Sequence, residues 1–183
     1  MSKMNFLQEH LGRYFLKVRT KKTKRKLHVN NFDTAHTIAI IYNCTDKKNN
    51  QKIEQFAQTI ADSHADIQIS LLGFCGANTT KQLHKTDIFS NKTFTKSDFT
   101  WYGAAKSATL EKFIKTPFDI LIDLSLEQNF PLEYIVQLSH ASFKIGRLHQ
   151  PLLYDFMIDI KNEKNIDYLI QQISVYLPSL KQK

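Results

Sequence analysis

The sequence predicts an α/β domain: one open, mostly parallel sheet with helices on both faces, plus a basic N-terminal helix. Three observations lead to this fold class. Short runs rich in β-branched and aromatic residues alternate along the chain with segments of helical periodicity. The short runs are apolar at almost every position, as in strands buried on both faces. The length of 183 residues, 42% of them hydrophobic, suffices for one domain with a substantial core.

The first element is a helix near the N-terminus. Apolar residues recur there at helical spacing, namely Leu7, Leu11, Tyr14 and Val18. This spacing predicts an apolar stripe that packs on the domain, with Arg13 and Lys17 on the opposite side. Gly12 costs the helix roughly 1 kcal/mol relative to alanine, so the helix needs a supporting surface.

The net charge of +8 is concentrated in residues 1–30. This segment holds nine of the 25 basic residues and one of the 17 acidic ones, so the rest of the chain is neutral. We therefore divide the chain into a basic amphipathic helix and linker, 1–30, and an α/β domain, 31–183. The candidate contacts to a polyanion are Arg13, Lys17, Arg19, Lys21, Lys22, Lys24, Arg25 and Lys26.

The basic run at 19–26 has three interpretations. It contacts the phosphates of a nucleic acid, it attaches the protein to an anionic membrane surface, or it is a solvated linker whose charge serves solubility. A protein partner is also compatible with the sequence. The apolar residues are periodic and no small-residue cleavage site follows them, so we expect no secretory signal, and no stretch is long and apolar enough for a transmembrane helix.

A β–α–β unit follows the basic segment. Residues 37–43 form an apolar, β-rich run, 50–64 have helical periodicity, and 67–73 form a second apolar run that ends at a glycine. Two strands joined by a helix form a parallel pair with a right-handed crossover.

The second half of the chain continues the alternation. A helix is predicted at 104–115 before Pro117, a strand at 118–124, and a helix that begins at Pro131. The remaining elements are two short strands at 143–146 and 155–160, a helix at 164–177, and a weak strand at 87–89 in the polar segment 77–103. The whole order is that of a single Rossmann-like domain.

The candidate catalytic residues follow the strands at 118–124 and 143–146, because ligands of such sheets bind at the carboxyl ends of the strands. They are Asp123, Ser125, Asn129 and Arg147. Asp119, Asp123 and Asp159 lie in or beside apolar runs, where a carboxylate needs partners. Each either serves a ligand or ties down a loop through hydrogen bonds.

The sequence gives little support for a nucleotide cofactor, a metal site or a reactive cysteine. The first strand lacks the glycine-rich turn that dinucleotides require, and no phosphate-binding loop occurs, so we expect no nucleotide cofactor. The seven histidines lack the spacing of metal ligands, so we expect no metal. Cys44 and Cys75 end adjacent strands, and we interpret them as small packing residues in a reducing, cytoplasmic compartment. Trp101 and Tyr102 are an aromatic pair that caps the core or stacks on a base.

Several segments resemble a family of small uncharacterised bacterial proteins in which a basic segment precedes a Rossmann-like body. The similar segments are 98–103, 118–125, 129–132, 142–147 and 154–159. This resemblance implies a fold and no activity. A weaker one, at 119–124 and 145–146, is to the N-terminal half of heptosyltransferase-type glycosyltransferases, which need a second domain that this chain has no room for.

From these observations we expect a non-enzymatic binding module whose basic segment contacts RNA or a ribonucleoprotein. The alternatives are a small transferase acting on a phosphorylated or sugar substrate, and a protein attached to a membrane surface.

Overall fold

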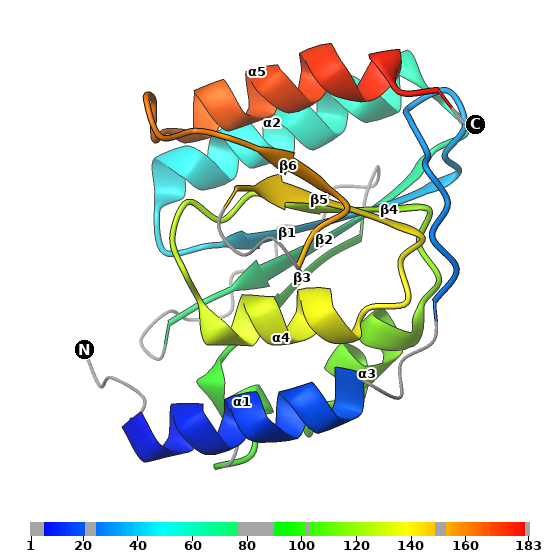
Figure 1. Cartoon of the computed structure of the whole chain (residues 1–183). Helices are drawn as coiled ribbons and strands as arrows, with labels where there is room; N and C mark the ends of the chain where they lie inside the picture. The colour runs from blue at the N-terminus through cyan, green and yellow to red at the C-terminus, as the bar shows by residue number, and fades with distance from the viewer. Residues whose placement is uncertain (1–5, 21–24, 77–89, 102, 149–152, 182–183) are drawn as a thin grey trace.

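The computed structural model describes residues 6–20, 25–76, 90–101, 103–148 and 153–181. Its centre is a six-stranded sheet with the strand order β3-β2-β1-β4-β5-β6 (Figure 1). The strands are β1 (Thr37–Asn43), β2 (Gln68–Phe74), β3 (Ser90–Phe94), β4 (Ile120–Asp123), β5 (Phe143–Arg147) and β6 (Phe156–Ile158). All neighbouring strands are parallel, so the predicted α/β class is confirmed.

Helices cover both faces of the sheet, and a further helix lies outside them. Helices α2 (Lys47–Ser63) and α5 (Ile166–Tyr176) cover one face, while α3 (Ala108–Lys115) and α4 (Phe130–Leu138) cover the other (Figure 1). Helix α1 (Phe6–Thr20) packs on α4, on the side away from the sheet. Two short 3-10 helices, η1 (Lys96–Asp98) and η2 (Leu177–Ser179), complete the described elements.

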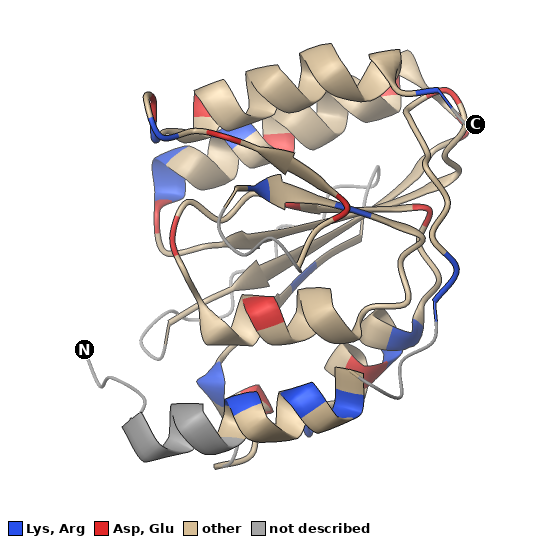
Figure 2. Cartoon of the chain, viewed as in Figure 1, with Lys and Arg blue, Asp and Glu red and all other residues tan. Residues whose placement is uncertain are grey.

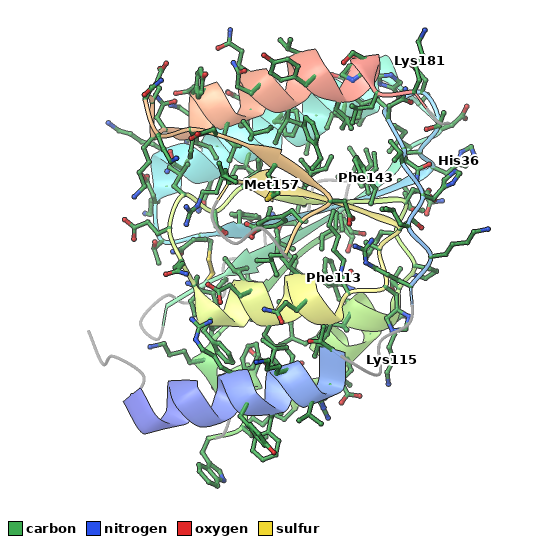
Figure 3. All side chains as sticks on the ribbon, viewed as in Figure 1. His36, Phe113, Lys115, Phe143, Met157 and Lys181 are labelled. Atoms are coloured by element: carbon green, nitrogen blue, oxygen red, sulfur yellow. A yellow bond between two sulfur atoms is a disulfide. The ribbon has the colours of Figure 1, made fainter. Side chains whose placement is uncertain are left out.

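The hydrophobic core has two parts because the sheet is buried on both sides. Along β1, Ile38 and Ile40 belong to the cluster under α2 and α5, whereas Ala39 and Ile41 belong to the cluster under α3 and α4. Successive side chains of a strand point to opposite faces, so a strand covered on both sides is apolar throughout. Figure 3 shows side chains filling the space on both sides of the sheet.

The third strand differs from its prediction. The predicted 87–89 strand lies outside the described residues, and the structure has β3 at Ser90–Phe94. This segment contains Ser90, Asn91, Lys92 and Thr93, with only its last residue buried. It pairs with β2 at the edge of the sheet, where polar side chains meet solvent, so it lacks the apolar run that marks the central strands.

The N-terminal helix forms, but the prediction of its buried side was wrong. Leu16 is 2% exposed and Gly12 is buried, whereas Tyr14 and Val18 face solvent. The side chains of residues 7 and 11 lie outside the described part of the chain. A Cβ at Gly103, whose φ is +80°, would lie 3.1 Å from the Cα of Gly12. The helix therefore docks through a close backbone contact that only a small residue allows, and the apolar spacing does not select its face.

Candidate functional site

The four candidate catalytic residues lie around one small pocket at the carboxyl edge of the sheet. Asp123 ends β4, Ser125 follows it, Asn129 precedes α4, and Arg147 ends β5. The other lining residues are Glu127, Gln128, Leu132, Glu133 and Tyr154. The pocket leaves about 10 Å³ for the centre of a water-sized group. The strands bring the predicted residues together, but the space holds a single small group and no sugar.

Asp123 is enclosed by hydrogen-bond donors. Its side chain accepts from the Ser125 backbone N–H at 2.8 Å, from the Ser125 hydroxyl, and from the Tyr154 hydroxyl at 2.7 Å. The residue is 3% exposed, and burial raises the pKa of its carboxyl, opposed by these hydrogen bonds and by Arg147. Both carboxylate oxygens are thus occupied within the protein, and Asp123 fixes the loop after β4 to the loop after β5.

Tyr154 is part of this site, although the sequence did not single it out as a site residue. Its ring lies against Gly146 of β5, where an added Cβ would come within 2.5 Å of two ring carbons. Burial and the nearby Asp123 raise the pKa of the Tyr154 hydroxyl, so it stays protonated and donates. The glycine at the second-last position of a buried strand was the available signal that another group approaches the backbone there.

Glu133 is a second buried carboxylate in the pocket, which the sequence also did not indicate. The residue lies on α4, is 4% exposed, and its Oε2 accepts from Arg13 of α1 at 2.9 Å. Its Oε1 is buried without a hydrogen-bond partner, and so is Oδ1 of Asn129. The Arg147 guanidinium donates through Nε to the Ser125 carbonyl at 3.0 Å. The pocket therefore contains two acceptor atoms that no donor from the described residues satisfies.

Asp119 and Asp159 are the other two acidic residues in or beside the apolar runs. The first has a structural role, and the second is exposed to solvent. Asp119 lies at the opposite end of β4, where its Oδ2 accepts from the backbone N–H groups of His36 and Thr37, each at 2.9 Å. It ties down the chain before β1, one of the two predicted roles. Asp159 was expected to be buried, and this was wrong: its side chain is half exposed, because β6 is short and ends at Ile158.

The first strand ends in a turn that leaves no place for a phosphate. Asp46 caps α2, and its Oδ1 accepts from the N–H groups of Lys48 and Asn49. These are the groups that hold a pyrophosphate in dinucleotide-binding folds. A carboxylate in that position repels a phosphate.

The two cysteines form a disulfide, so their interpretation as independent packing residues was wrong. Cys44 and Cys75 are bonded through sulfur, and their Cα atoms are 5.2 Å apart. The register of the parallel pair β1 and β2 sets Asn43 opposite Phe74, so the next residue of each strand faces the other. Because 31 residues separate the cysteines, their pairing follows from the register of the sheet and not from their spacing in the sequence.

The arginines of the basic segment bind to the body of the domain. Arg13 pairs with Glu133, and Arg19 donates to the Tyr134 hydroxyl at 2.7 Å. Arg25 donates to Asp155 at 2.5 Å and to the Ser142 carbonyl at 3.0 Å. Arg13 was expected on the solvent side of the helix, and this was wrong, because the docked face includes it.

The described lysines of the basic segment have a different environment. Lys17 and Lys26 are exposed, and Lys21, Lys22 and Lys24 lie outside the described residues. Figure 2 shows basic positions recurring along α1, on the side of the molecule opposite α2 and α5. The segment thus combines arginines that hold it in place with lysines that face solvent.

Lys144 of β5 is a buried cation that the sequence did not reveal. Its Nζ donates to the Val136 carbonyl at 2.6 Å, near the end of α4. Burial, reinforced by the nearby Arg25, lowers the pKa of Lys144 to about 7, and Asp155 partly opposes this shift. It is not among the residues that line the pocket at the ends of β4 and β5, and it bears on stability and pH dependence.

Trp101 does not cap the core, contrary to one of its two interpretations. The residue is 69% exposed, and the loop that carries it contacts α1 through Gly103. Tyr102 lies outside the described residues. Within the described chain, no cluster of three or more His, Cys, Asp or Glu side chains has the arrangement of a metal site. None of the described helices is long and apolar enough to cross a membrane.

Comparison with known proteins gives a family and no activity. Residues 8–180 match the model of a family of unknown function, DUF6913, so the expectation of an uncharacterised family is confirmed. No curated protein and no solved structure matches the chain. The matched range includes most of the N-terminal helix together with the domain. The chain belongs to this family.

Proposed function

We propose that the protein is a binding module that contacts single-stranded RNA through α1 and the lysine-rich segment after it. The main observation behind this proposal is that the arginines and the described lysines of the basic segment have different environments. Its three arginines bond to the domain, which fixes the segment in one place. Lys17 and Lys26, in contrast, are exposed. Solvent-facing ammonium groups beside anchored arginines suit contacts to phosphates, which position a nucleic acid without reading its sequence.

Exposed aromatic rings beside these lysines favour a single strand. Tyr14 is 65% exposed on α1 and forms an edge-to-face pair with Phe15, whose ring centroid is 5.8 Å away. Trp101 lies in the loop that contacts α1. Bases of a single strand stack on such rings, and each stack contributes about 1–3 kcal/mol.

The transferase alternative has less support. Asp123, Ser125, Asn129 and Arg147 share a pocket, but it admits one water-sized group. Both oxygens of Asp123 are also engaged by Ser125 and Tyr154. The likeness to heptosyltransferase-type enzymes remains a resemblance. The bacterial origin and the cytoplasmic location stay predictions from the sequence.

The test is the affinity for a fluorescent oligouridylate, measured by anisotropy at several salt concentrations. We expect binding that weakens steeply with salt. One variant replaces by glutamine the five lysines between residues 17 and 26, namely Lys17, Lys21, Lys22, Lys24 and Lys26. Its matched control replaces five lysines remote from α1, namely Lys47, Lys48, Lys161, Lys164 and Lys181. The first variant should lose binding and the control should keep it.

A second variant tests stacking. Tyr14→Ala should weaken binding about tenfold, while Tyr176→Ala, which removes a half-exposed ring from α5, should leave it unchanged. Equal loss in the two lysine variants, or affinity that does not depend on salt, contradicts the proposal. So does binding to vesicles containing phosphatidylserine in the absence of binding to RNA, since that result assigns the face to a membrane surface.

A further inference from the structure

We propose that the pocket at the carboxyl ends of β4 and β5 binds the ammonium group of a primary amine, with Glu133 as its charged acceptor. This proposal is independent of RNA binding, because the pocket uses none of the exposed lysines. It assigns a ligand class to the part of the molecule where the candidate catalytic residues converge.

The two unsatisfied acceptors are the main reason. Oε1 of Glu133 and Oδ1 of Asn129 are both buried, and neither has a donor among the residues that the structure describes. Leaving a buried acceptor without a partner costs about 1–3 kcal/mol, and more for a charged group. Two such atoms in the lining of one small pocket predict an occupant that donates hydrogen bonds.

The charges that line the pocket determine whether its ligand is a cation or an anion. The carboxyl groups of Asp123, Glu127 and Glu133 line it, against the single guanidinium of Arg147, whose Nε donates to the Ser125 carbonyl. The Arg13 guanidinium binds only one oxygen of Glu133, at 2.9 Å, so the second oxygen still attracts a positive donor. An anion at the same position would meet that carboxylate oxygen directly.

Size and coordination separate an ammonium group from a metal ion. The space of about 10 Å³ matches one water-sized group, and an –NH₃⁺ group has that size and three donors. The oxygens of Asp123 already accept from Ser125 and Tyr154, which leaves Oε1 of Glu133, Oδ1 of Asn129 and the exposed carboxylate of Glu127 at the mouth. Calcium takes six to eight oxygen ligands, far more than this set offers.

The mouth of the pocket allows the rest of the amine to reach solvent. Glu127 and Gln128, in the loop between β4 and α4, line the pocket and are exposed. A substituent on the amine nitrogen therefore has a way out past polar side chains. The carboxylate of Glu127 adds attraction for a cation approaching from this side.

The test compares methylammonium chloride with tetramethylammonium chloride at constant ionic strength, using the midpoint of thermal unfolding. Methylammonium carries three N–H donors and a small head, whereas tetramethylammonium has the same charge, no donor and a larger head. We expect a saturable rise in the midpoint with methylammonium alone. Identical responses to the two salts overturn the proposal, since they indicate that water alone occupies the pocket.

Variants locate the binding to these atoms. Glu133→Gln should weaken methylammonium binding at least tenfold, and Asp66→Asn, which neutralises an exposed carboxylate elsewhere, should leave it unchanged. Asn129→Ala provides a variant that folds, because the Asn129 side chain makes no capping hydrogen bond to α4. It should weaken binding severalfold. Wild-type affinity in both Glu133→Gln and Asn129→Ala contradicts the assignment.

Discussion

Two arginine–carboxylate pairs fasten the N-terminal segment to the domain, and they differ in how completely the carboxylate is satisfied. At the first, Oδ1 of Asp155 accepts from Arg25, and Oδ2 accepts from the backbone N–H of Lys144 at 2.8 Å. At the second, Oε2 of Glu133 accepts from Arg13, and Oε1 has no donor within the described part of the chain. Yet Glu133 is the more buried side chain, 5% exposed against 13% for Asp155.

This difference separates an anchor from a binding site. Burial raises the cost of an unpaired polar atom, so the more buried carboxylate should be the better satisfied one. Asp155 has a partner for each oxygen, as a structural residue needs. Glu133 departs from that expectation, and it does so inside a pocket, where a ligand can supply the missing donor.

The largest expected effect comes from disturbing the pocket through Gly146. In Gly146→Ala the new methyl group meets the Tyr154 ring at 2.5 Å, so the ring must move and its hydroxyl leaves Asp123. We expect a loss of about 3 kcal/mol in the free energy of unfolding, measured with urea. The ion pair between Arg25 and Asp155 should persist, so this variant should disturb the pocket that contains Glu133 and leave the Asp155 anchor in place.

Gly76→Ala is the matched control. The nearest atom to a Cβ there is Thr45 Cγ2 at 3.7 Å, an ordinary contact, so stability should change little. Equal losses in the two alanine variants would show that the close contact of Tyr154 with β5 is unimportant.

A smaller effect is expected from pH, and it concerns the Asp155 anchor. Burial lowers the pKa of Lys144 to about 7 in the folded protein, from an ordinary value of 10.5 in the unfolded chain. Between these values the unfolded chain binds more protons, so stability rises with pH and is lost as pH falls through this window. Relative to Lys144→Met, the wild type should gain about 2 kcal/mol between pH 7 and pH 9.

Urea unfolding of both proteins at pH 7, 8 and 9 measures this difference. Parallel pH profiles would mean that Lys144 keeps an ordinary pKa in the folded protein. Comparison with the variant removes the contributions of the other titrating groups, which the two proteins share.

The smallest expected effect separates arginine from lysine within the segment. Arg25 donates with one nitrogen to Asp155 and with another to the Ser142 carbonyl, a fork that lysine cannot reproduce. Arg25→Lys should therefore cost about 1 kcal/mol of unfolding free energy. Lys26→Gln, at an exposed position, should stay within about 0.5 kcal/mol of the wild type. Similar losses in both variants would remove the distinction between anchoring and solvent-facing residues.

The convergence of four candidate residues on one pocket was predictable, and its chemistry was not. Asp123, Ser125 and Arg147 follow parallel strands, and the carboxyl ends of such strands meet at one edge. Glu133 and Tyr154 have no such mark in the sequence. In the sequence Glu133 resembles a surface acid, but α4 has almost no exposed residue because α1 packs on its outer side.

By itself the sequence determined the alternation of strands and helices, the α/β class and the confinement of the excess charge to residues 1–30. Each of these follows from local composition and period, which a short window contains. Only the tertiary structure decided the disulfide, the docked face of α1, and which basic residues are anchors. Arg13 and Glu133 are 120 residues apart, and their contact depends on strand order and on the close approach of Gly12 to Gly103. Partners at such separations are set by how the layers pack, which local patterns do not encode.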